Sequence, residues 1–367
     1  MKETAVPEQS LDESTRRETL RLLAPGTALR DGLERILRGN TGALVILGTD
    51  RATESMLSGG FPMDVPFSAT RLRELAKMDG AIVVDEDVTT ILSANVQLLP
   101  DPTIATDETG TRHRTADRVS KQTGFPVISV SKSMNIIAMY QNGVRHVIES
   151  SSEILARANQ AVATLERYKL RLDEVQRNLS ALEIEDLVTI RDVASVAQRT
   201  QMVLRIASEI EDYVIELGTD GRLISLQLEE LMAGVAADRA LMLRDYTPTK
   251  IGRKNRTAEQ AAADLDQLDS TALLDLVNVA AAIGFPAAAD LLEQPISARG
   301  YGLLSRVPRI PEAISERIIA HFKSLKDLLA ASTDDLQAVE GVGDMRARSI
   351  RDGLSRIAES ALMERFS

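Results

Sequence analysis

The sequence predicts three consecutive units: an α/β N-terminal domain with a central mixed sheet (residues 1–150), an all-α helical linker domain (151–295) and an all-α C-terminal domain of paired helices (296–367). Three observations predict this order. Helical and strand patterns alternate up to about residue 148. Leucines and other apolar residues then recur at helical spacing. Two pairs of helical patterns close the chain, each joined by a turn that contains glycine or proline.

In the N-terminal domain, apolar periodicity predicts the helices and strands, and glycine or proline residues mark where they end. Apolar spacing predicts helices over Leu11–Leu23, Ala28–Leu37, Ser68–Met78 with Ser68 as N-cap, and Arg112–Gln122 ended by Gly124. Short apolar runs predict strands over Gly42–Gly48, Gly80–Asp85, Thr89–Leu98, Pro126–Ser131, Asn135–Tyr140 and Val144–Glu149. Alternation of this kind is typical of one sheet covered by helices.

The middle of the chain predicts helices alone. From Ser151 the strand patterns stop, and leucine and valine steps of three, four and seven indicate one face of a long helix. Two further long helices are expected near Ile184–Leu217 and Leu223–Arg244. Thr247–Thr257 is polar and basic, which indicates a linker or surface loop. Nothing in this region suggests catalysis, so we expect a helical bundle or spine.

Composition excludes several classes of site. The chain of 367 residues has no cysteine, which excludes disulfides, zinc–thiolate sites and cysteine nucleophiles, and a cytoplasmic location is expected. We expect no secretory signal in the polar N-terminus and no membrane span. The net charge of −11 argues against a nucleic-acid coat over the whole protein. From residue 296 on, however, 11 Lys and Arg balance 10 Asp and Glu, so this tail is the least acidic part.

The tail contains a motif that suits contact with a phosphate backbone. Gly341-Val342-Gly343 joins two helical patterns, and paired glycines allow a tight turn and a close approach of another backbone. The following helix offers its N-terminal N–H groups to an anion. An upstream segment, Leu303–Phe322, has a similar plan around Pro308–Pro311. The pair resembles a tandem helix-hairpin-helix module, which implies backbone recognition of DNA that weakens steeply with salt. The expected DNA contacts are Gly341, Val342, Gly343, Arg346 and Arg348.

Three stretches of the α/β domain suggest a nucleotide site. Asp79 directly precedes Gly80 and a strand, which leaves a carboxylate beside open backbone. The run Arg112-His113-Arg114 occupies the first turn of a helix, where acids are usual and cations need a nearby anion. Ser131 lies at the end of a strand. Neither GxxxxGK[ST] nor GxGxxG is present, so a bound nucleotide would be held by another scheme.

The stretches DGA, TRHRT, TGALVILG and VISVSKSMNIIAMY closely resemble the diadenylate cyclase family, and the resemblance to its DNA-binding members extends from about residue 10 to 367. It implies that two ATP condense into cyclic di-AMP and two pyrophosphates across a subunit interface. It also implies Mg²⁺ or Mn²⁺, a homo-octamer, binding of branched DNA that lowers synthesis, and a cytoplasmic, nucleoid-associated protein.

Carried onto this sequence, the resemblance gives Asp79 the roles of base and metal ligand. The implied ATP-binding residues are Gly80, Ala81, Leu98, Thr111, Arg112, His113, Arg114, Thr115 and Ser131. Gly42 fits a loop beside the nucleotide. Lys132 departs from the acidic or amide residue that family members often have there.

Two other functions compete with the cyclase. The chain could be a non-catalytic, oligomeric DNA-binding repair scaffold, or a sensor that binds ATP without turnover. The combination of Asp79 with the intact Arg112-His113-Arg114 run favours the enzyme, because a scaffold has no use for phosphate donors beside a carboxylate.

Overall fold

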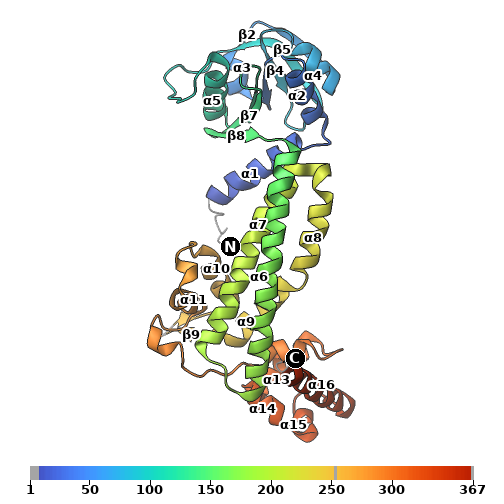
Figure 1. The fold of residues 1–367 in the computed structure, drawn as a ribbon, viewed down its shortest axis with the longest axis vertical. Helices are drawn as coiled ribbons and strands as arrows, with labels where there is room; N and C mark the ends of the chain where they lie inside the picture. The colour runs from blue at the N-terminus through green and yellow to red at the C-terminus, as the bar shows by residue number, and fades with distance from the viewer. Residues whose placement is uncertain (1–7, 252–253, 365–367) are drawn as a thin grey trace. The chain divides into compact units, whose positions relative to one another are not determined.

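The computed structural model describes residues 8–251 and 254–364. They form two compact units. The first runs up to Gln160 and includes Glu209–Leu226; the second comprises Ala161–Ser208 and the chain from Gln227 on. Figure 1 shows the α/β region in blue and green, followed by long helices and a set of short C-terminal helices. The predicted fold class is confirmed: an α/β domain, a helical linker and a C-terminal helical domain.

One mixed sheet is the centre of the first unit. Its strand order is β2-β5-β4-β1-β6-β7-β8, with β3 also paired to β5. Only β1 and β4 run parallel, and the other neighbours are antiparallel. The strands are β1 (Ala43–Leu47), β2 (Leu57–Ser58), β3 (Phe61–Pro66), β4 (Ala81–Val84), β5 (Thr90–Leu98), β6 (Val127–Ser131), β7 (Ile136–Gln141) and β8 (Val144–Ile148).

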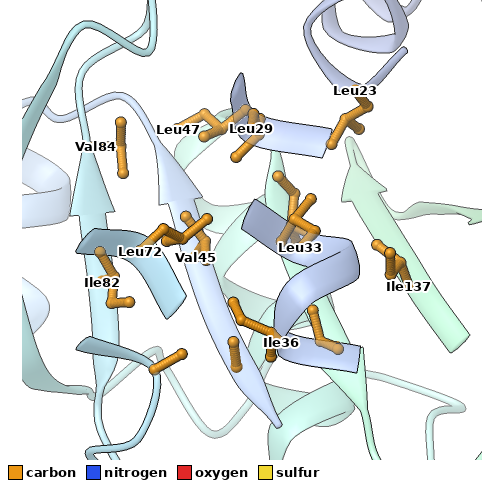
Figure 2. Packing of buried hydrophobic residues seen from close by; sticks show 14 of the residues in the cluster. Leu23, Leu29, Leu33, Ile36, Val45, Leu47, Leu72, Ile82, Val84 and Ile137 are labelled. Atoms are coloured by element: carbon orange, nitrogen blue, oxygen red, sulfur yellow. The ribbon is translucent and has the colours of Figure 1, made fainter. Parts of the chain in front are cut away.

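Helices cover both faces of this sheet, so the central strands are apolar on both sides. Every residue of β1 is buried. Val45 and Leu47 face a layer built by α1 (Glu8–Leu23), α2 (Ala28–Arg38) and α4 (Ala69–Leu75), which Figure 2 shows from close by. Leu44 and Ile46 face the opposite layer, which is built by α3 (Arg51–Met56) and α5 (Thr111–Thr123). Burial on both faces explains why β1 has no alternation of apolar and polar residues.

Some predicted boundaries in this unit are wrong. The elements α3, β2 and β3 were not predicted, because β3 has two prolines and follows two glycines. Proline fits β3 since the strand is exposed and pairs only with β5. The helix predicted to reach Met78 ends at Leu75, although Ser68 is its N-cap as expected.

The linker begins with two long helices, α6 (Ser151–Glu185) and α7 (Ile190–Leu217). The single long helix predicted near Leu223–Arg244 is wrong, because the structure has two helices there. It is split into α8 (Arg222–Met232) and α9 (Val235–Tyr246), because Gly234 adopts a φ of 80° that no helix interior allows. The expected loop at 247–257 holds a two-stranded hairpin, β9 (Lys250–Ile251) with β10 (Lys254–Asn255), and α10 (Ala258–Gln267) and α11 (Leu276–Ile283) follow.

The C-terminal domain contains the two predicted hairpins. The first joins α12 (Tyr301–Ser305) to α13 (Glu312–Phe322), and the second joins α15 (Thr333–Gln337) to α16 (Asp344–Glu364), with α14 (Leu325–Ala330) between the two hairpins. Ala347 is fully buried, which suits a small residue where two helices pack closely. Within the described part of the chain, no helix combines the length and apolar character that crossing a membrane requires.

Candidate nucleotide site and DNA-binding hairpins

A cleft of about 820 Å³ opens in the first unit, at the end of the sheet where strand β4 begins and strands β5 and β6 finish. These ends meet because β5 and β6 run antiparallel to β4 and β1. The N-terminus of α5 forms the other wall. The cleft is lined by Leu44, Asp79, Gly80, Ala81, Asn95, Val96, Gln97, Leu98, Gly110, Thr111, Arg112, His113, Thr115, Ser131 and Ser133.

The cleft brings together nearly all the residues predicted to bind nucleotide. Arg114 is the exception, since it is exposed and does not line the cleft. The reason is helical geometry: residues two apart on a helix point to different sides, so Arg112 and Arg114 diverge. Sequence reasoning missed Leu44, Asn95, Val96, Gln97, Gly110 and Ser133 as lining residues. Of these, Leu44 and Ser133 lie within quoted motifs and Gly110 directly precedes one, whereas no local pattern distinguishes the others.

Asp79 is held at the cleft by a close backbone contact. A Cβ on Gly80 would lie 2.5 Å from Cα and 2.8 Å from the carbonyl oxygen of Asn95, so only glycine fits. Asn95 has a φ of 56°, and the register between β4 and β5 shifts beside it. The Asp79 side chain is fully exposed, and its Oδ1 lies 3.6 Å from Nη2 of Arg112. A free carboxylate and a guanidinium therefore share the mouth of the cleft.

Arg112 is positioned by the glycine that precedes β1. A Cβ on Gly42 would lie 2.9 Å from Cζ of Arg112 and 3.2 Å from the carbonyl oxygen of Val130. Because Gly42 has no side chain, the Arg112 guanidinium can occupy the space beside its Cα. The Arg112 side chain keeps about a third of its surface exposed, so it remains available to a ligand.

The start of α5 is built to receive an anion. Gly110, its N-cap, has a φ of 85° and offers no side chain to the first N–H groups. The first turn also contains no acidic residue. An uncapped helix N-terminus carries a partial positive charge and N–H donors, and here both border the cleft beside Arg112.

His113 is buried behind this wall. Its Nδ1 lies 2.8 Å from the hydroxyl of Tyr140, whose side chain is fully buried on β7. Burial lowers the pKa of His113, and Glu108 opposes that effect. Burial also raises the pKa of Tyr140, so the phenol keeps its proton. His113 is therefore a neutral imidazole that lines the cleft.

Ser131 lies at the end of β6. It is buried, and its Oγ accepts a hydrogen bond of 3.4 Å from the backbone N–H of Met134. Ser133 Oγ lies 3.4 Å from the same oxygen, so two hydroxyls sit side by side at this corner of the cleft. Lys132, between them, is exposed.

Comparisons with known proteins match nearly the whole length of the chain. Residues 30–145 match the model described as DisA bacterial checkpoint controller nucleotide-binding, and residues 148–292 match the DisA bacterial checkpoint controller linker region. DNA integrity scanning protein DisA of Streptomyces coelicolor is 62% identical over 350 residues, which cover 95% of this chain and 94% of that protein. DisA of Kineococcus radiotolerans is 59% identical over 361 residues, with coverage of 98% and 100%. This chain belongs to the DisA family.

The third domain of this DisA-family chain matches a SAM-like helix-hairpin-helix tandem over residues 301–356. Each of its two hairpins has one residue with a positive φ, three positions before its second helix begins. Gly341 in the second hairpin has a φ of 86°, and Arg309 at the corresponding place of the first has a φ of 66°. A groove of about 630 Å³ runs between them. It is lined by Pro308, Arg309, Ile310, Gly343, Asp344, Met345, Arg346, Ser349 and Ile350.

Two of the five predicted DNA contacts, Gly343 and Arg346, line this groove. Val342 is buried and does not line the groove. The Arg346 guanidinium donates to the carbonyl of Gly341, and Arg348 pairs with Asp344 at 3.0 Å. Both arginines lie at the surface of the hairpin, but each already has an intramolecular partner that DNA would have to replace.

The nucleotide cleft has one carboxylate for a cation. Asp79 is the only acidic residue among those that line it, and the described residues contain no group of three or more His, Asp or Glu side chains arranged to hold a metal ion. Magnesium is commonly held by one or two carboxylates together with substrate phosphates and water. Asp79 fits that pattern, provided that the nucleotide brings the remaining ligands.

Proposed function

We propose that this DisA-family chain is a diadenylate cyclase, which condenses two ATP into cyclic di-AMP and two pyrophosphates across the interface of two subunits. One observation carries the proposal: the exposed carboxylate of Asp79 and the guanidinium of Arg112 meet at the mouth of a cleft beside an uncapped helix N-terminus. A carboxylate can accept a proton from a hydroxyl, and the cationic wall can hold a triphosphate.

Each half of the reaction is an in-line phosphoryl transfer. The ribose 3′-oxygen of one ATP attacks the α-phosphorus of the ATP in the facing subunit. The new P–O ester bond forms as the bond from the α-phosphorus to the bridging oxygen breaks, and pyrophosphate leaves with that electron pair. The hydroxyl proton passes to Asp79. The second transfer, with the two nucleotides exchanging roles, closes the ring.

The protein's contribution is placement and charge. Arg112 and the α5 N–H groups would stabilise charge on the departing pyrophosphate, and the apolar side of Leu98 would lie against the adenine. The full exposure of Asp79 lets it reach a substrate presented by a partner subunit. A lone chain holds half of the reacting pair, so assembly belongs to the mechanism, and we propose an octamer of paired cyclase domains.

Asp79 would also hold the divalent cation, Mg²⁺ or Mn²⁺, together with phosphate oxygens. When bound, such an ion supplies charge neutralisation on the triphosphate and lowers the pKa of the attacking hydroxyl. Arg112, 3.6 Å from Asp79, would then turn from this carboxylate to the phosphates.

For the tail we propose backbone contact with branched DNA, which lowers synthesis and brings the protein to the nucleoid. The support is a positive φ at the corresponding position of both hairpin turns and the groove between them. Titration of fluorescent branched DNA should give an affinity that falls steeply with salt. Arg346→Gln should lower that affinity while ATP turnover without DNA stays unchanged.

The decisive experiment incubates the purified full chain with ATP and Mg²⁺ or Mn²⁺ and follows cyclic di-AMP by mass spectrometry. We expect product, and its loss in Asp79→Asn. Asp87→Asn is the matched control, because Asp87 is an exposed acid beyond the opposite end of β4. ATP bound without product would favour the sensor. Neither ATP binding nor product would favour the non-catalytic scaffold.

A further inference from the structure

The second helix of each C-terminal hairpin begins with an acidic residue. α13 begins with Glu312 and α16 with Asp344, and each acid follows the positive-φ residue of its own hairpin by three positions. A carboxylate in the first turn of a helix competes with a phosphate for the N–H groups and the positive dipole end. Each hairpin therefore gains affinity for a DNA phosphate if a cation neutralises this acid.

The second hairpin neutralises its acid from within. Arg348 lies four residues after Asp344, on the same side of α16, and the two side chains pair at 3.0 Å. The first hairpin lacks this pairing, because Glu316 occupies the position four residues after Glu312. Two negative charges on one side of α13 destabilise each other and repel a phosphate. The first hairpin therefore depends on a cation from another element.

Linker helix α9 supplies this cation through Arg244. Its Nη1 donates to Oε1 of Glu312 at 2.9 Å, and its Nη2 donates to Oε1 of Glu316. The guanidinium also lies over the ring of Tyr301, with its Cζ 4.2 Å from the ring centroid. The Tyr301 hydroxyl donates to the other oxygen of Glu316 at 2.9 Å. One guanidinium from the linker thus bridges both acids at the start of α13.

Contacts beside Arg244 hold the end of α9 against the first hairpin. Asp245 is buried, and its carboxylate accepts hydrogen bonds of 2.7 to 2.8 Å from three backbone N–H groups at the start of α12. In the reverse direction, Arg299 donates to the carbonyl oxygens of Arg244 and Thr247 at 2.5 and 2.6 Å. Each helix end is therefore capped by the other segment. These caps place Arg244 independently of the two acids that it contacts.

We propose that Arg244 neutralises Glu312 and Glu316 so that the first hairpin can accept a phosphate of the DNA backbone. This inference rests on the proposed binding of DNA by the two hairpins. Arg244 does for the first hairpin what Arg348 does for Asp344 in the second, so it is a positioning residue that acts through the two acids. The DNA-binding unit then includes the last turn of α9, which lies in the segment that matches the linker model.

Titration of fluorescent branched DNA with the full chain tests this role, and urea denaturation of each variant checks its folding. Arg244→Gln should weaken the affinity about 3- to 10-fold, the share of roughly one phosphate contact. Adding Glu316→Arg to that variant gives α13 the acid–arginine spacing of α16, and it should restore the affinity to within about twofold of the wild type. Adding Asp290→Arg instead supplies the same charge at an exposed acid outside both hairpins, and the affinity should stay low.

The outcomes separate this inference from the proposed function of the tail. Equal recovery with Asp290→Arg would mean that net charge alone matters, and recovery in neither double variant would mean that Arg244 serves folding only. Either result overturns the inference. Wild-type affinity in Arg244→Gln overturns it as well, while DNA binding by the hairpins stands. If the wild-type chain binds no DNA, the proposed function of the tail fails together with this inference.

Discussion

Gly42→Ala tests the placement of Arg112 without altering the arginine itself. Gly42 does not line the cleft, yet its bare Cα makes the space in which the guanidinium lies. Its φ is outside the left-handed region, so alanine is compatible with the backbone. The heavy atoms nearest to the added methyl group belong to the guanidinium and to the carbonyl of Val130.

The distances give the size of the effect. The new Cβ would lie 2.9 Å from Cζ of Arg112, and ordinary contacts begin near 3.4 Å. The guanidinium must therefore retreat by about 0.5–1 Å. A misplacement of about 1 Å can cost about 10²-fold in rate, so we expect a 10- to 100-fold loss of turnover. The free energy of unfolding should change by less than about 1 kcal/mol, because the restricted unfolded chain offsets the crowding.

The assay is cyclic di-AMP production at saturating ATP, with urea denaturation of the same preparation as the control for folding. A double-mutant cycle locates the effect. In an Arg112→Ala background, Gly42→Ala should cost less than about twofold, since the displaced group is gone. Turnover near the wild-type level in Gly42→Ala, or an equal loss in both backgrounds, would refute the reasoning that the glycine serves Arg112.

Two further predictions concern the second unit. Burial raises the pKa of Glu183 to about 7 from an ordinary 4.5. As pH rises, this carboxyl therefore loses its proton at a higher pH in the folded chain than in the unfolded chain. Between pH 4.5 and 7 its contribution to the free energy of unfolding therefore falls as pH rises. Glu183→Gln, which keeps an acceptor for the Tyr246 hydroxyl, should remove that slope and raise stability at pH 8 by up to about 3 kcal/mol, measured by urea denaturation. Arg309→Gly should raise the free energy of unfolding by about 1 kcal/mol, because glycine adopts a φ of 66° without strain. The same change should lower the salt dependence of DNA binding by about one unit of slope if Arg309 contacts a phosphate. A stability equal to that of the wild type, or a slope that does not change, would contradict these two expectations respectively.

The sequence alone determined the elements whose signal is local. The apolar run of β1 and the Ser68 cap can be read within a few residues, and both are confirmed. The start of α5, expected at Arg112, lies one residue earlier, at Thr111. The break at Gly234 and the edge strand β3 were missed because their local signals are ambiguous. A glycine is tolerated in many helices, and prolines usually argue against a strand.

Only the tertiary structure decided which residues meet. Asp79 and Arg112 are far apart in the chain, and Gly80 faces Asn95 because β4 pairs with β5. The same folding buries His113 against Tyr140 and turns Arg114 away from the cleft. A periodic pattern states which face of an element is buried, but not which strand lies beside it. The site consists of contacts between segments that are distant in sequence, and such contacts depend on strand pairing and on helix packing.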